Sequence, residues 1–338
     1  MDLFKSIVPE IKLHPAFKLL LDKDNEEERL LLQAWSDGMP DRDGKFVKEL
    51  QITFESSLWE LYVHAVLKEL NYETDFRHSS PDFSVVAPFR FTIEATVTRP
   101  EFDGKSPVGW SIQDIPTDFT AFNNDATLRL CNSIKQKLEK FRSSYSCMPH
   151  VSNLPFVLAI GAYDRPGSHL AASRPIIAAL YGVYHDEQAA INGALSSVPA
   201  YEVDGATKKN GTNVQLGLFN DAGCSEISAV VYSCLATWGK VRALAKNPRY
   251  NLRFTSFHPN AESIYPKVFE TAGATYPEQL CDGLYVFRNP YAKNPLPVEV
   301  FDHPRIAKSI ALPRNNFDFE CPDDFLLARF VRTTKLPT

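Results

Sequence analysis

The stretch PDFSVVAPFRFTIEATV, residues 81–97, contains two extended runs that flank the turn signal Ala87-Pro88. In the second run apolar and polar residues alternate from Phe91 to Thr98, which is the period of a strand with one apolar and one polar face. The stretch therefore predicts a β-hairpin. Asp82 lies at the start of its first strand, and Glu94 lies on the polar face of its second.

Helices and further strands are predicted on either side of this hairpin. Residues 54–70, FESSLWELYVHAVLKEL, have apolar residues at helical spacing over so broad a face that the helix should be buried on most sides. Residues 71–76 form a short strand candidate. Residues 126–142 combine an apolar helical stripe with the most basic segment of the chain, and residues 154–163 are a continuous apolar run typical of a buried strand. The predicted order is helix, three strands, helix, strand.

This order predicts an α/β fold. We expect residues 1–50 to form a helical N-terminal leader, residues 51–235 to form the core, and residues 236–338 to be a C-terminal extension that packs on the core. Within the extension, the proline-rich residues 282–297 are expected to wrap the surface.

Composition restricts the class of protein without deciding its function. The six cysteines show no zinc spacing and no disulfide framework, and no apolar run reaches the roughly 18 residues that span a bilayer. We therefore expect a cytoplasmic protein with no membrane partner. The net charge of -5 counts mildly against a dedicated nucleic-acid binder, but the distribution of charge matters more than its sum.

Carboxylates are the candidate functional groups of the hairpin. Asp82 and Glu94 on adjacent strands could share a divalent cation, because Mg²⁺ prefers oxygen ligands. Glu60 lies in the most apolar part of the preceding helix, where an unpaired charge is costly, so it needs a metal or a partner such as Lys68 or a distant arginine. The alternative interpretation of Asp82 is an ordinary strand-start residue after a proline turn.

Glu60, Pro81-Asp82 and the sequence Glu94-Ala95-Thr96 together resemble the PD-(D/E)XK, or restriction endonuclease-like, nuclease superfamily. The resemblance covers roughly residues 51–165. It implies a mixed sheet with helices on both faces, with Asp82 and Glu94 as metal ligands and with Glu60 supporting the site. One departure from the family pattern is Thr96, which stands where the family has a lysine. Lys137 or Lys140 on the basic helix could supply the missing ammonium group, and the sequence does not choose between them.

The predicted function is metal-dependent hydrolysis of phosphodiester bonds, with Mg²⁺ or Mn²⁺ as cofactor. DNA as the substrate rests on the resemblance alone, and a homodimer or a partner protein is possible. One alternative is a degenerate nuclease-fold module that only binds nucleic acid. Another is a glycoside hydrolase that uses two carboxylates. In the expected long loop of residues 99–121, Phe102, Trp110 and Phe119 could stack on bases or pin the loop to the core.

Overall fold

The computed structural model describes residues 1–99, 111–311 and 317–336. Phe102 and Trp110 of the predicted loop lie outside the described residues, whereas Phe119 is the first residue of a helix. The α-helices are α1 (Pro15–Leu21), α2 (Glu26–Trp35), α3 (Phe46–Ile52), α4 (Phe54–Glu69), α5 (Phe119–Ser143), α6 (Arg174–Tyr181), α7 (Glu187–Gly193) and α8 (Trp238–Ala245).

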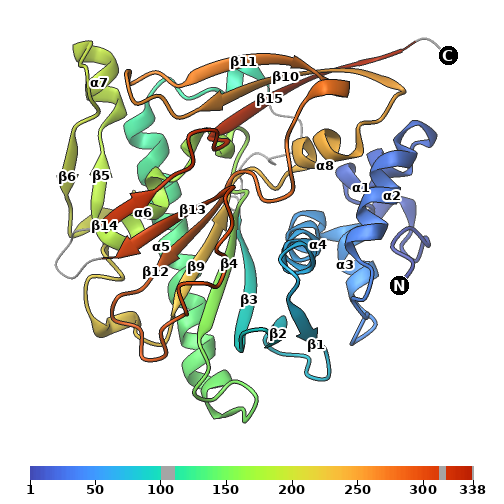
Figure 1. The fold of residues 1–338 in the computed structure, drawn as a ribbon, viewed down its shortest axis with the longest axis horizontal. Coiled ribbons are helices and arrows are strands. Elements are labelled where there is room, and N and C mark those ends of the chain that lie inside the picture. The colour runs from blue at the N-terminus through green and yellow to red at the C-terminus, as the bar shows by residue number, and fades with distance from the viewer. Residues whose placement is uncertain (100–110, 312–316, 337–338) are drawn as a thin grey trace.

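A mixed eight-stranded sheet forms the centre of the molecule, in the order β1-β2-β3-β4-β9-β12-β13-β14 (Figure 1). Its strands are β1 (Glu73–Asp75), β2 (Phe83–Ala87), β3 (Phe91–Thr98), β4 (Phe156–Ala162), β9 (Ala229–Ser233), β12 (Leu284–Arg288), β13 (Ile306–Ala311) and β14 (Phe317–Glu320). The predicted α/β class with a mixed central sheet is confirmed. The hairpin is also confirmed, because β2 and β3 are antiparallel with Phe83 opposite Ile93.

The remaining strands form three smaller sheets. β10 (Tyr250–His258) lies between β11 (Lys267–Ala272) and β15 (Ala328–Lys335). Two short hairpins consist of β5 (Val183–His185) with β6 (Ala200–Glu202) and of β7 (Gly205–Thr207) with β8 (Asn213–Gln215). Within the described ranges, every helix is too short or too polar to cross a membrane.

Each face of the central sheet is covered by its own apolar layer. On one face, Ile93, Val157 and Val231 pack with the N-terminal helices and with α4 and α8. On the other face, Leu158 and Val230 pack with α5 and α6. Because side chains alternate along a strand, Glu94, which lies opposite Leu158, belongs to the α5 face. That face of β3 was predicted to be polar, and the structure shows it buried beneath α5.

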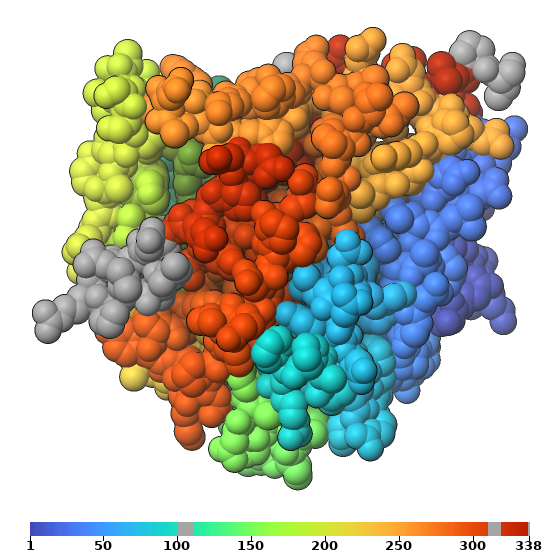
Figure 2. Space-filling view, in the orientation of Figure 1, coloured from blue at the N-terminus to red at the C-terminus, as the bar shows by residue number. Residues whose placement is uncertain are grey.

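The N-terminal helices adjoin α8 of the C-terminal third of the chain. Helices α2 and α8 pack together, and Figure 2 shows the blue N-terminal segment beside the yellow-orange segment near residue 250. A buried ion pair between Arg242 and Glu28 joins these helices, and the Asn247 side-chain amide donates to the other oxygen of Glu28 over 2.6 Å. Within residues 236–338, β12, β13 and β14 are strands of the central sheet itself.

Candidate functional site

The hairpin brings Asp82 and Glu94 to neighbouring positions on adjacent strands. Asp82 immediately precedes β2, and its Oδ2 accepts a hydrogen bond from the backbone N–H of Ala95 over 2.7 Å. Glu94 lies in the middle of β3 and is only 2% exposed. The fold therefore places both carboxylates where the sequence predicted them, and it buries Glu94 almost completely.

Helix α5 supplies two ammonium groups to Glu94. Nζ of Lys137 is 2.6 Å from Oε1 of Glu94, and Nζ of Lys140 is 2.9 Å from the same oxygen. The two lysines are three residues apart and so lie on the same face of the helix. Ile134, Leu138 and Phe141 on α5 pack into the core and fix its position over β3.

Tyr145 completes the hydrogen bonding of Glu94. Its hydroxyl group donates to Oε2 of Glu94 over 2.8 Å, while the ammonium group of Lys140 lies 4.9 Å from the centre of its ring. Burial raises the pKa of Tyr145 to about 12, so this hydroxyl remains a donor at neutral pH. Tyr145 follows the basic helix directly, but no motif or spacing in the sequence indicates its role.

Opposing effects set the pKa of Glu94 and of Lys140. Burial acts to raise the pKa of Glu94, but the two neighbouring ammonium groups outweigh it and hold this pKa below its ordinary value. Burial acts to lower the pKa of Lys140, whereas hydrogen bonding to Tyr145 and Glu94 outweighs it and raises this pKa. Glu94 is thus a carboxylate and Lys140 an ammonium ion at neutral pH.

Glu60 on α4 is near enough to the two hairpin carboxylates for its ionisation to be affected by both. Burial, followed by the like charge of Asp82, raises the pKa of Glu60 well above its ordinary value, and Glu94 adds to the effect. Arg42 acts in the opposite direction. The alternative pairing of Glu60 with Lys68 does not occur, because the ammonium group of Lys68 donates to the carbonyl oxygens of Ala34 and Asp37.

Arg42 and a pair of histidines hold the loop that carries Asp82. The Arg42 guanidinium donates to the carbonyl oxygens of Asp82, over 3.0 Å, and of His78, over 2.5 Å. The rings of His78 and His150 are stacked with their centres 3.7 Å apart, and Nε2 of His150 lies 2.8 Å from the carbonyl oxygen of Ser80. No sequence pattern indicates these contacts, because they join segments that lie far apart in the chain.

Asp82 should make the stability of the protein depend on pH. Burial and the charge of Glu94 raise its pKa to about 7, so the folded chain binds a proton that the unfolded chain releases near pH 4. This contribution to stability is present below about pH 4 and is lost as the pH rises to about 7. The side chain keeps some exposure, so we expect Asp82→Asn to be about 1–2 kcal/mol more stable than wild type at pH 8, with little difference at pH 4.

Thermal or urea unfolding of both proteins across this pH range measures the effect. The asparagine side chain of the variant can still accept the hydrogen bond from Ala95, so the comparison isolates the charge. A difference in unfolding free energy that stays constant from pH 4 to pH 8 would contradict the raised pKa.

Asp82 and Glu94 offer carboxylate oxygens, which are the donor atoms that a hard divalent cation prefers. In the described part of the chain, no group of three or more His, Cys, Asp or Glu side chains is arranged to hold one metal ion. Mg²⁺ is commonly bound through one or two protein carboxylates and otherwise by water and substrate oxygens. Asp82 and Glu94 match such a donor set in number and in chemistry.

Neither the family models, nor the curated proteins, nor the solved structures give a match to this chain.

Proposed function

We propose that this chain is a metal-dependent nuclease that hydrolyses phosphodiester bonds, with DNA as its substrate. The observation that carries the proposal is the pair of acidic residues at β2 and β3, with two lysines from the next helix at the second acidic residue. The order α4, β1, β2, β3, α5, β4, with β3 and β4 parallel, supports a restriction endonuclease-like core.

The charges of the site favour a bound cation. Burial and the like charges of acidic neighbours raise the pKa values of Asp82 and Glu60, so neither carboxylate ionises easily. A divalent ion held by Asp82 and Glu94, with Glu60 supporting it, would relieve this repulsion. Mg²⁺ or Mn²⁺ bound there would polarise the phosphorus centre and lower the pKa of the attacking water.

Lys137 and Lys140 supply the positive charge of the motif lysine, which Thr96 replaces in this chain. Thr96 is half-buried on β3 and carries no charge, whereas Lys137 and Lys140 place two positive charges at the carboxylate of Glu94. Their ammonium groups would stabilise negative charge that develops on a phosphate at this site. Tyr145 positions Glu94 by holding its Oε2.

A binding-only protein is the second candidate. Both ammonium groups contact Oε1 of Glu94, so this oxygen is already neutralised by the protein itself. A nuclease-fold module that has lost catalysis could retain such an ion-pair network for stability and use its basic helix to hold phosphate groups.

Incubation of the purified chain with plasmid and with single-stranded DNA separates the two candidates. We expect cleavage in Mg²⁺ or Mn²⁺ and none in EDTA. DNA retained in a mobility-shift assay, with no cleavage in either metal, would overturn the nuclease proposal in favour of binding alone.

A further inference from the structure

A hollow lies at the carboxyl ends of the parallel strands β4 and β9. The chain leaves β4 toward α6 on one face of the sheet, and it leaves β9 toward α8 on the opposite face. The connections of these adjacent strands thus diverge, and a crevice at such a point is the usual ligand site of an open α/β sheet. Glu94 pairs with Leu158 in the first half of β4, so the candidate nuclease site lies away from this end of the strands.

The hollow is an apolar cavity built from segments far apart in the sequence. Its volume is about 360 Å³, within the range of roughly 300–1,000 Å³ that is common for small-molecule sites. Its apolar wall includes Leu19 of α1, Phe54 and Leu58 of α4, and Trp238 of α8. These side chains offer both aliphatic and aromatic surface to a ligand.

One end of the cavity is electropositive. Thr237, the N-cap residue of α8, makes no capping hydrogen bond through its side chain, and Thr237, Trp238 and Gly239 line the cavity, so the positive end of the helix dipole lies at its wall. Behind them lies Arg329, a lining residue that is 4% exposed. Its Nε has no hydrogen-bond acceptor within the described ranges.

The charges around Arg329 leave an excess of positive charge. Arg329 and the buried Lys240 both contact Oε1 of Glu278, over 3.0 and 2.7 Å. The neighbouring Asp282 is engaged by Arg305. On the opposite wall, Oε1 of Glu55 lies 3.4 Å from Nε2 of His14 and accepts no hydrogen bond from the described residues. Two cations therefore share one carboxylate directly behind the N-terminus of α8.

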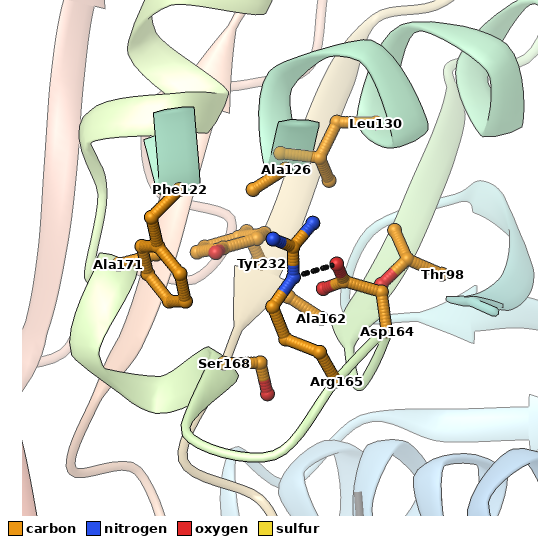
Figure 3. Close-up of a pocket in the computed structure, with 10 residues that line it drawn as sticks. All are labelled: Thr98, Phe122, Ala126, Leu130, Ala162, Asp164, Arg165, Ser168, Ala171 and Tyr232. Carbon is orange, nitrogen blue, oxygen red and sulfur yellow. Dashed lines mark hydrogen bonds and ion pairs between the residues drawn. The ribbon is translucent and has the colours of Figure 1, made fainter. Parts of the chain in front are cut away.

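The segment that follows β4 also borders a second space, which is closed. Figure 3 shows the Arg165 guanidinium directed to Asp164, among Phe122, Ala126 and Tyr232. This space does not admit a water molecule. A ligand at the carboxyl ends of the strands must therefore enter on the α4 side.

We propose that this cavity binds a small organic anion with an apolar, flat body. The anionic group lies at the N-terminus of α8 near Arg329, and the body packs against Leu19, Phe54, Leu58 and Trp238. A phosphate monoester and a carboxylate share this chemistry.

Calorimetric titration of the full chain in EDTA tests the proposal, with 1-naphthyl phosphate, 1-naphthoate, 1-naphthol and inorganic phosphate as probes. We expect one or both aromatic anions to bind at one site with a dissociation constant below about 1 mM, at least about tenfold more tightly than 1-naphthol or phosphate. The aromatic anion that binds more tightly identifies the head group. Failure of both to bind overturns the proposal.

Variants at exposed leucines place the bound probe. Leu19 lines the cavity and is 42% exposed, so it tolerates replacement, and Leu30 on α2 is 58% exposed and lies outside the lining. We expect Leu19→Glu to weaken binding of the anion about tenfold, and Leu19→Gln or Leu30→Glu to change it less than about threefold. Equal affinities in all three variants would contradict binding in this cavity.

Binding in this cavity is independent of the proposed nuclease activity. The titration contains no metal, and the Asp82→Asn variant is expected to bind the probe as wild type does. A chain that cleaves DNA but binds no aromatic anion refutes the cavity alone, and the reverse result refutes the nuclease alone.

Discussion

Asp82→Asn and Glu94→Gln are each expected to reduce DNA cleavage by at least about a thousandfold, because each removes one negative oxygen donor from the proposed metal site. Both changes keep the size of the side chain. The amide oxygen introduced by Asp82→Asn can accept from the N–H of Ala95, and the one introduced by Glu94→Gln can accept from Lys137 and Lys140 in place of Oε1, with its NH2 group facing the hydroxyl oxygen of Tyr145. The measurement is the rate of plasmid nicking at saturating Mg²⁺.

Glu226→Gln is the matched control for this pair. Glu226 pairs over 2.7 Å with Arg142, which lies on α5 as Lys137 and Lys140 do. Glu226 makes no contact with Glu94. We expect its cleavage rate to stay within about twofold of wild type, since a partly exposed ion pair adds little to stability. Circular dichroism should show folded protein for all three variants. Full activity of folded Asp82→Asn or Glu94→Gln would exclude the proposed site.

Lys137→Met is expected to lower the saturated cleavage rate about a hundredfold, which corresponds to about 3 kcal/mol in the transition state. Methionine keeps the stem of the side chain and removes the charge. The structure favours Lys137 over Lys140 as the operative lysine, because its ammonium group is closer to Glu94 and its side chain is 23% exposed against 48%. A more buried charge is screened less by solvent and acts more strongly on a bound phosphate.

Lys140→Met should behave differently. Its ammonium group also contacts the ring of Tyr145 and is more open to solvent, so we expect weaker DNA binding and a flatter salt dependence, with less than about a tenfold change in the saturated rate. Lys135→Met, on another face of α5, serves as the control for loss of charge from this helix. Equal rates for Lys137→Met and wild type would leave Thr96 without a replacement lysine.

Much of the site's framework could be predicted from local patterns. The broad apolar stripe predicted residues 54–70, and α4 extends over Phe54–Glu69. The alternation after Ala87-Pro88 predicted the hairpin, and the basic amphipathic stretch predicted α5, although this helix begins earlier, at Phe119. These features depend on neighbours within one element, which is the information that periodicity carries.

Other features depend on which segments meet in space. Residues 282–297 were expected to wrap the surface because of their prolines, but Leu284–Arg288 forms β12 between β9 and β13, so that interpretation was wrong. The apolar run Leu284–Phe287 is four residues long, too short for its burial to be evident beside so many turn signals. The contacts of Arg42 and Tyr145 with the site likewise follow from tertiary packing.

Calorimetric titration of Mn²⁺ into the wild-type chain at pH 8, where Asp82 is mostly ionised, is the most direct test of the proposed metal site. We predict that one ion binds, and that Asp82→Asn and Glu94→Gln each bind it at least about tenfold more weakly. The wild-type affinity should also fall as the pH is lowered through about 7, because a proton on Asp82 competes with the ion. Unchanged Mn²⁺ affinity in both variants, or no binding to the wild-type chain, would contradict a metal site at Asp82 and Glu94.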